Sequence, residues 1–225
     1  MRLAGAPAGL LPALALLAAA ASAGTDPGKA TAPRMEFVPP APGSYTLQNI
    51  QRVADAALLD STGRVIRLAA VTQTKITLLT FFYTYCVDPL GCPFAHTTLA
   101  DLRDRVRGDR ALAARVRFVS VSLDPTHDTP AAVAGYGREF NVDSRFEWRF
   151  LTARGVPELL PVLDDFGQEV SVDVDDNGRA TRTLHHMLKM FLIDAHGEIR
   201  EIYTLAFIQP QVIFNDIKTL ALEAG

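Results

Sequence analysis

The only two cysteines of the 225-residue chain, Cys86 and Cys92, are separated by five residues. A thiolate is both the nucleophile of disulfide exchange and a ligand for soft metals such as Cu(I). Pro89 and Gly91 favour a sharp turn between them, so both sulfurs can face one ligand. The alternative is a plain stabilising disulfide, but closing so small a loop contributes at most about 2–3 kcal/mol. The spacing therefore predicts thiol redox chemistry or a soft-metal site, without choosing between them.

The chain has five histidines, any of which could supply a nitrogen ligand to such a site, and His185 and His186 are adjacent. Residues 187–193, directly after them, have the pattern of a strand. Two thiolates and one imidazole suit trigonal Cu(I). From spacing alone, however, two solvent-facing histidines at the start of a strand are the simpler interpretation. His96 is expected on a helix surface, His127 in a turn and His196 at the tip of a hairpin.

The elements on either side of the cysteines would place them where α/β proteins often carry out chemistry. Residues 76–83 form an unbroken β-branched and aromatic run, which predicts a central strand buried on both faces. After Cys92, the apolar residues Leu99, Leu102 and Val106 recur at helical spacing. The cysteines are thus expected between the carboxyl end of a strand and the amino end of a helix. The unpaired N–H groups and dipole of that helix end favour a thiolate.

The rest of the chain alternates strand and helix patterns. This alternation predicts an α/β protein with a mixed central sheet that is flanked by helices. A turn at 173–178 should join two edge strands. Other strands are predicted at 65–68, 116–123, 146–151, 187–194 and 198–205, and helices at 129–140, 156–166 and 209–223.

The N-terminal residues resemble an export signal, with Arg2, an apolar run from Leu10 to Ala21 and the small residues Ala21-Ser22-Ala23. Residues 1–23 are therefore predicted to be a signal peptide or an N-terminal anchor. The Pro-rich residues 24–44 are predicted to be a linker, and 45–225 the folded domain. We expect an exported, periplasmic protein, either soluble or tethered to the inner membrane.

Composition excludes some other functions. Hydrophobic residues make up 48% of the chain and charged residues 21%, as in a globular protein. A net charge of −3, without a run of Lys and Arg, argues against nucleic acid as a partner. The chain also has neither a phosphate-binding glycine loop nor a nucleophilic serine motif.

Three motifs in order resemble those of the Sco/SenC family, and the similarity extends from about Tyr45 to the C-terminus. They are Phe81-Phe82-Tyr83-Thr84-Tyr85-Cys86 with Cys92-Pro93, then residues 119–125 with Asp128-Thr129-Pro130, and then His186 with Phe191-Leu192-Ile193-Asp194 and Gly197. The resemblance implies a thioredoxin-like fold with an inserted β-hairpin. It also implies one copper ion, Cu(I) or Cu(II), bound by Cys86, Cys92 and His186.

Two features depart from the usual family pattern. Five residues rather than three lie between the cysteines, which changes the reach of the two sulfurs. His185 stands where the family usually has an aspartate before its ligand histidine, so an orienting carboxylate is missing. Both His185 and His186 therefore remain candidates for the nitrogen ligand.

Three functions are compatible with these residues. The first, which the resemblance implies, is a copper metallochaperone for a respiratory cytochrome c oxidase. It would be a transfer protein rather than a turnover enzyme, with oxidase subunit II or another exported thiol protein as its partner. The second is an exported thiol–disulfide oxidoreductase in which Cys86 attacks a partner disulfide and Cys92 resolves the product. The third, a peroxide-reducing enzyme, is disfavoured because Thr84-Tyr85-Cys86 lacks the expected Pro-x-x-x-Thr/Ser-x-x-Cys pattern. Metal binding should require His186, whereas thiol exchange should tolerate its loss.

Overall fold

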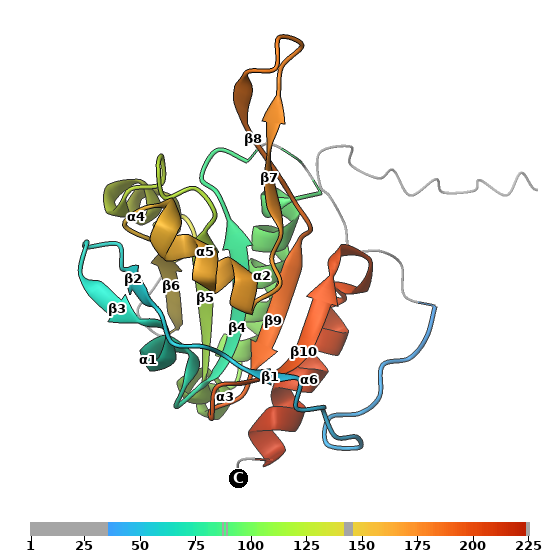
Figure 1. The fold of residues 1–225 in the computed structure, drawn as a ribbon. Helices are drawn as coiled ribbons and strands as arrows, with labels where there is room; N and C mark the ends of the chain where they lie inside the picture. Colours follow the sequence, from blue (N-terminus) through green and yellow to red (C-terminus); the bar gives the residue numbers. More distant parts are fainter. Residues whose placement is uncertain (1–35, 87, 89, 142–145, 224–225) are drawn as a thin grey trace, which may run out of the picture.

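A computed structural model describes residues 36–86, 88, 90–141 and 146–223. The described chain is built on a six-stranded mixed sheet with the strand order β1-β10-β9-β4-β5-β6 (Figure 1). Strands β4, β5 and β6 run parallel, while β9 is antiparallel to β4 and β10 is antiparallel to both β9 and β1. The strand bounds are β1 Gln51–Arg52, β4 Ile76–Phe82, β5 Val116–Ser122, β6 Glu147–Leu151, β9 Lys189–Ile193 and β10 Glu198–Thr204.

Strand β4 is the central element, and every one of its residues is buried, as the sequence predicts. Successive side chains of a strand point to opposite faces of the sheet. Phe81 packs edge-on against Phe166 at 5.5 Å between ring centroids, while Phe82 packs against His96 at 5.5 Å on the other face. An apolar run without alternation therefore suits a strand covered by helices on both sides.

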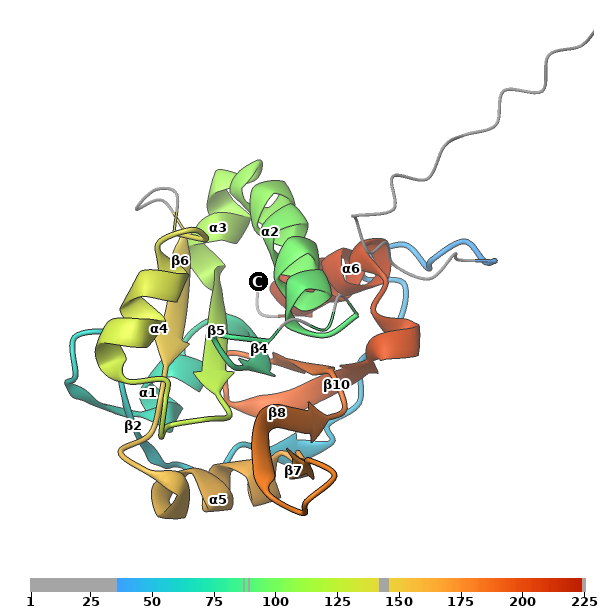
Figure 2. The same cartoon turned by 90° about the horizontal axis from the view of Figure 1, so that it is seen from above.

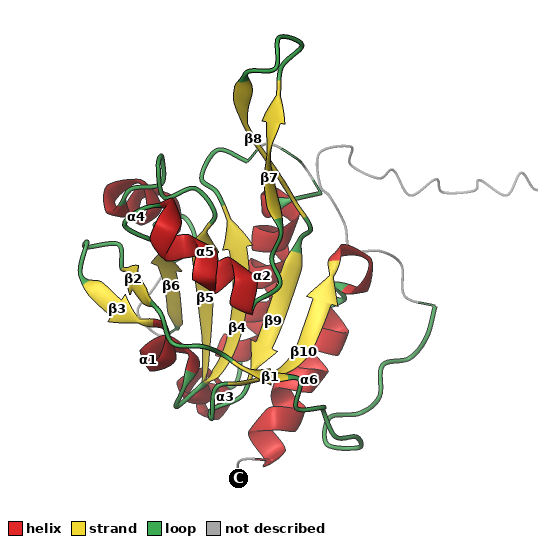
Figure 3. Ribbon diagram, viewed as in Figure 1, coloured by secondary structure: helices red, strands yellow, loops and turns green. Residues whose placement is uncertain are grey.

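The helices lie in two layers around this sheet (Figures 2 and 3). Helices α2, α3 and α6 lie together on one face, and α5 covers the other. Helix α4 packs beside the edge strand β6. The helix bounds are α1 Leu68–Thr72, α2 Cys92–Arg107, α3 Arg110–Arg115, α4 Pro130–Gly137, α5 Val156–Asp165 and α6 Pro210–Glu223, with a 3-10 turn at Leu205–Phe207.

Two small antiparallel sheets lie outside the main one. Strands β2 (Ala57–Leu59) and β3 (Val65–Arg67) form the first. Strands β7 (Val170–Val174) and β8 (Ala180–His186) form the second, a hairpin inserted between α5 and β9 that projects beyond the end of the central sheet (Figure 1). The predicted mixed sheet with flanking helices and an inserted hairpin is confirmed.

Local differences from the sequence-based expectations are small. Leu68 was expected to end a strand, but it begins α1, because the main chain turns after Arg67 and Leu68 becomes fully buried. The helix expected to reach residue 140 ends at Gly137. Its start agrees with the prediction: Thr129 caps the helix by accepting a hydrogen bond from the N–H of Ala132, and Pro130 is the first helical residue.

The predicted export signal and most of the predicted linker lie outside the described residues. The end of that linker is packed against α6: the Asn215 side chain donates to the carbonyl of Pro40 at 2.8 Å, and the Gly43 N–H donates to Thr219 at 3.0 Å. Within the described ranges, no helix combines the length and apolar character needed to cross a bilayer.

Candidate metal and thiol site

The register of the central strands fixes where the cysteine loop begins. Ile76 pairs with Val116 and Phe82 with Ser122, so β4 and β5 end level with each other. The N–H of Leu123 continues the ladder by donating to the Phe82 carbonyl at 2.7 Å. The cysteine loop after β4 and the 123–128 turn after β5 therefore leave the sheet side by side.

The two cysteines occupy opposite ends of one tight loop and differ in exposure. The N–H of Cys86 donates to the Tyr83 carbonyl at 3.2 Å, directly after the strand. Cys92 is the first residue of α2 and is only 1% exposed, whereas Cys86 is partly exposed. This is the placement that the sequence predicts, and only the Cys86 sulfur can meet a partner from solvent.

Gly91 lets the loop close over the first sulfur. A Cβ atom added at Gly91 would lie 3.3 Å from Cys86 Sγ and 3.3 Å from the carbonyl oxygen of Asp88. The N–H of Gly91 donates to that same carbonyl at 2.9 Å, which closes the turn. A side chain at position 91 would therefore press on both the turn and the thiol.

The surroundings of the two cysteines shift their pKa values in opposite directions. The Cys92 side chain hydrogen-bonds to Cys86, and this bond is the main cause that lowers the pKa of Cys86 to about 5. Hydrogen bonds from the Cys92 N–H and the Tyr83 hydroxyl act in the same direction, whereas partial burial opposes them. The same bond and burial raise the pKa of Cys92 well above its ordinary value. At neutral pH, Cys86 is thus the nucleophilic and metal-binding sulfur, and Cys92 keeps its proton.

The hairpin separates the two adjacent histidines onto opposite faces. His185 is exposed, and its Nε2 lies 3.4 Å from an Asp173 carboxylate oxygen. His186 points to the other side, where its ring centroid lies 6.0 Å from that of Tyr83. Since the Tyr83 hydroxyl contacts Cys86, His186 is the histidine on the cysteine side.

The His186 ring is partly buried and presents one of its two nitrogens without a hydrogen-bond partner among the described residues. Its Nδ1 faces the Leu184 carbonyl oxygen at 3.5 Å, a long contact that favours a proton on Nδ1. Its Nε2 is shielded from solvent and has no hydrogen-bond partner among the described residues. Burial lowers the pKa of His186 although the nearby Cys86 opposes the shift. A neutral ring with a free acceptor nitrogen is the form that binds a metal ion.

The structure does not bring the three predicted ligands into one cluster. Among the described residues, no three His, Cys, Asp or Glu side chains lie close enough to hold a metal ion. The structure brings Cys86 and Cys92 together and places His186 next to Tyr83. The residue types fit a soft metal, but His186 and the sulfurs must approach one another to form a three-ligand site.

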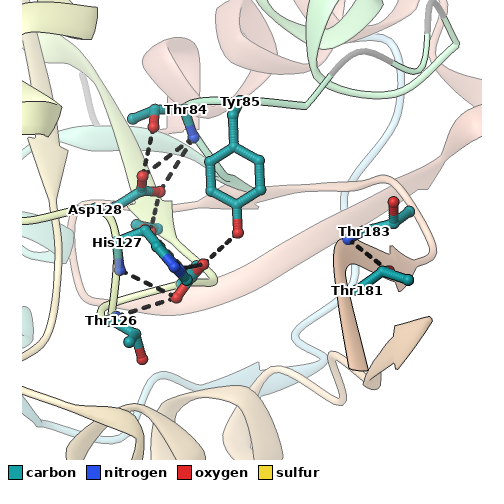
Figure 4. A network of polar contacts seen from close by, with 9 residues as sticks. Thr84, Tyr85, Thr126, His127, Asp128, Thr181 and Thr183 are labelled. Atoms are coloured by element: carbon teal, nitrogen blue, oxygen red, sulfur yellow. Dashed lines mark hydrogen bonds and ion pairs between the residues drawn. The ribbon is translucent and has the colours of Figure 1, made fainter. Parts of the chain in front are cut away.

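Two buried carboxylates that sequence reasoning did not assign hold the cysteine loop in place (Figure 4). Asp128 is fully buried and accepts hydrogen bonds from the Thr84 hydroxyl at 2.5 Å, the Thr84 N–H at 3.1 Å and the Ser122 hydroxyl at 2.6 Å. Asp124 accepts from the Tyr85 hydroxyl and lies 2.6 Å from His127 Nδ1. Both belong to the second sequence motif, which signals their importance but not their partners.

The hydrogen bonds of Asp124 keep its carboxylate ionised. Burial opposes its ionisation, but the hydrogen bonds from Tyr85 and His127 prevail and hold the pKa of Asp124 below its usual range. Burial and the same bond to Asp124 raise the pKa of Tyr85 to about 12, so its hydroxyl keeps its proton and donates it. His127, expected only in a turn, thus also supports this carboxylate.

The expectation that His96 lies on a helix surface is wrong. His96 is 2% exposed and is surrounded by the rings of Phe82, Tyr136, Phe140, Trp148 and Phe150. Its Nδ1 lies 2.9 Å from the Cys92 carbonyl oxygen, and burial lowers the pKa of His96 to about 4. The error has a simple cause: His96 follows Cys92 by four residues and precedes Leu99 by three, so it lies on the buried stripe of α2.

The sheet, the helix that begins at the second cysteine and the inserted hairpin define a thioredoxin-like thiol protein. The family model described as SCO1/SenC matches residues 47–222. The match covers most of the chain, and the protein belongs to the SCO1/SenC family. No curated protein matches the chain.

Solved Sco structures share this fold. ScoI of Bradyrhizobium japonicum, with copper bound, is 23% identical, with a TM-score of 0.60, over 75% of this chain and 98% of that chain. ScoI of Arabidopsis thaliana, also with copper bound, is 19% identical, with a TM-score of 0.64, over 77% and 99% of the two chains. BsSco, described as a cytochrome c oxidase assembly protein with a disulfide switch, is 20% identical, with a TM-score of 0.59, over 79% and 98%.

Proposed function

We propose that this protein binds one copper ion through Cys86, Cys92 and His186 and transfers it to an exported partner during assembly of a cytochrome c oxidase copper site. The observation that carries the proposal is the shielded Nε2 of His186, which has no partner among the described residues and lies on the side of the hairpin that faces the cysteines. Family membership and the copper-bound Sco relatives support the choice of copper.

Each ligand has a distinct part in binding this cargo. Cys86 offers a thiolate that solvent can reach, and it makes the first contact. Cys92 must then give up its proton, since a metal-bound thiol is deprotonated. The Leu184 carbonyl holds the proton of His186 on Nδ1 and leaves Nε2 free to bind. Loading therefore releases a proton from Cys92, and binding weakens as the pH falls.

A Cu(I) competition titration of the fully reduced protein tests this proposal. We expect one tightly bound copper per chain in the wild type and a loss of at least about tenfold in affinity for His186→Ala. His185→Ala is the matched control, because that side chain lies on the opposite face of the same strand. Equal losses in the two variants, or no binding by the wild type, would contradict the ligand set.

The cellular setting belongs to the same proposal. We infer export to the periplasm from residues 1–23, which act as a cleaved signal or an anchor, with oxidase subunit II as the recipient. A fusion of residues 1–44 to a reporter enzyme that is active only outside the cytoplasm should be active. A fusion that begins at residue 24 should be inactive, and equal activity of both would reject the signal.

Thiol–disulfide exchange is the second candidate function, favoured by the asymmetry of the two cysteines. Cys86 is accessible and ionised, whereas Cys92 is buried and protonated, which suits attack followed by resolution. The rate at which the reduced protein attacks a small disulfide should fall to background in Cys86→Ser but stay within about twofold of wild type in His186→Ala. A protein that exchanges disulfides rapidly and binds copper without any need for His186 would favour this second function.

A further inference from the structure

A groove of about 770 Å³ begins directly beside the cysteine loop. Helix α5 forms one wall through Leu160 and Leu163, and one face of the β7–β8 hairpin forms the other through Val172 and Leu184. Tyr85, the neighbour of Cys86, closes the end of the groove next to the site. A molecule that lies in this groove would therefore contact Tyr85, one residue before the reactive sulfur.

The rim of the groove carries apolar side chains that the fold leaves uncovered. Val156 is 46% exposed, Leu160 is 51% exposed and Val172 is 50% exposed, and they come from both walls. A pocket for a small molecule buries most of its ligand and its own lining, whereas clustered apolar side chains at an open rim are typical of a protein-binding surface. These three residues are unnecessary for the core and are suited to contact a partner.

The groove lining also carries one arginine, Arg182, which forms no ion pair with a described carboxylate although Asp124, Asp164 and Glu169 line the same groove. The Arg182 guanidinium lies over the Tyr85 ring, 4.2 Å from its centroid, and makes no ion pair within the described part of the chain. Arg182 is exposed on β8 and, with Tyr85, lines the part of the groove next to the cysteine loop. A carboxylate on a docked segment would complete an ion pair there.

The length of the groove suits an extended strand. Its α5 wall has ten residues, which corresponds to about 15 Å at 1.5 Å per residue. An extended chain rises about 3.3 Å per residue, so four or five residues of a partner would span it. Alternate side chains of such a segment would face the apolar walls, as in other strand-like recognition modes.

We propose that this groove docks an extended segment of the partner protein, with apolar side chains between α5 and the hairpin and a carboxylate paired with Arg182. The proposal deepens the proposed function and rests on it, because docking would present the partner's cysteines to Cys86.

In the exchange step, the Cys86 thiolate attacks a partner disulfide. A Cys86–partner disulfide forms, and the other partner sulfur leaves as a thiolate. The Cys92 thiol then loses its proton to solvent and attacks Cys86, which releases the partner thiolate.

The probes are three short peptides, acetyl-Val-Leu-X-Cys-amide with X as Glu, Gln or Lys, each activated as a mixed disulfide with thionitrobenzoate. N-acetyl-cysteine amide with the same leaving group is the small reference. When Cys86 of the reduced full-length protein attacks a probe, coloured thionitrobenzoate is released and its absorbance gives the rate. We expect the rate ratio of peptide to reference to be about tenfold higher for Glu than for Lys, with Gln between them.

Variants at the exposed residues separate docking from chemistry. Leu160→Ser and Val172→Ser should each lower the peptide-to-reference ratio about threefold or more, with the reference rate unchanged. Val174→Ser is the matched control, since Val174 is 58% exposed on the same strand but does not line the groove. Arg182→Glu should reverse the preference toward the Lys peptide, a result that general damage to the loop would not produce.

The outcomes distinguish the docking proposal from the proposed function. Equal ratios for all peptides, with a normal reference rate and normal Cu(I) binding, would overturn docking and leave the function intact. A reference probe that does not react, together with absent Cu(I) binding, would contradict the function and docking together. A wild-type dimer in sedimentation experiments that Leu160→Ser dissociates would assign the groove to a second copy of the chain and overturn the proposal.

Discussion

The two halves of the candidate site are held in different ways. The cysteine half continues from the fully buried strand β4 and is fixed by Asp124 and Asp128, which the turn after β5 supplies. The histidine half stands on a hairpin that pairs only with itself and projects beyond the sheet (Figure 1). None of the residues 169–187, all of which the structure describes, is buried.

This contrast explains why three candidate ligands exist without forming a cluster. The core determines the cysteine pair, so its sulfurs are in place before any metal arrives. His186 depends on a hairpin whose orientation costs little to change, because few buried contacts are lost when it moves. The proposed copper transfer would use this difference, with the hairpin closing over the sulfurs to bind the ion and moving away to release it.

The largest expected effect on stability comes from a substitution in the cysteine half of the site. Asp128→Ala removes the acceptor of three hydrogen bonds, which come from the half-buried Thr84 and the buried Ser122. We expect the free energy of unfolding to fall by about 3 kcal/mol. Urea denaturation followed by circular dichroism measures this change.

The control for Asp128→Ala is Asp109→Ala, in which an exposed carboxylate that caps α3 is lost. This cap should contribute only about 1 kcal/mol. If the two variants were equally stable, the account of Asp128 as the anchor of the cysteine loop would be wrong.

The next effect concerns His96, which is buried beneath the second cysteine. Burial lowers its pKa to about 4 in the folded protein, against about 6.5 in the unfolded chain. The unfolded chain therefore takes up the proton first as the pH falls. Stability from this group is complete above pH 6.5 and is lost between pH 6.5 and 4, by about 3 kcal/mol in total. In His96→Gln, this part of the pH dependence should disappear.

Unfolding free energies of both proteins at pH 7.5, 6, 5 and 4.5 provide the measurement. Each carboxylate contributes alike to the two curves, so their difference isolates His96. A difference that stays constant with pH would mean that His96 has the same pKa in the folded and the unfolded protein, contrary to its burial among aromatic rings.

The smallest effect is expected in the hairpin. Asp173→Ala removes the exposed contact with His185, and such surface pairs contribute less than about 1 kcal/mol. The midpoint of thermal unfolding should therefore shift by no more than about 2 °C. A loss as large as that of Asp128→Ala would show that the hairpin belongs to the cooperative core and would remove the contrast between the two halves.

The sequence predicts the elements near the site well, because their patterns are local and strong. The uninterrupted apolar run of β4, the Thr129-Pro130 helix start and the turn at 173–178 each carry a physical signature that the structure reproduces. The position of Cys92 at the start of α2 follows from the same reasoning.

Other features depend on tertiary contacts and could not be predicted from residue patterns. The bonds from Thr84 to Asp128 and from Tyr85 to Asp124 join residues about 40 positions apart, which no local pattern encodes. Which of His185 and His186 faces the cysteines depends on the pairing of β7 with β8. The burial of His96, by contrast, followed from its helical spacing and was misjudged because a polar residue was assumed to face solvent.

The central claim is that His186 moves onto the two sulfurs when the cargo ion binds. X-ray absorption spectroscopy of the Cu(I)-loaded protein tests it directly, with His186→Ala and His185→Ala measured alongside the wild type. The account predicts two sulfur scatterers and one nitrogen scatterer in the wild type and in His185→Ala, and loss of the nitrogen in His186→Ala. A nitrogen that persists in His186→Ala, or a wild-type site with sulfur alone, would contradict the account.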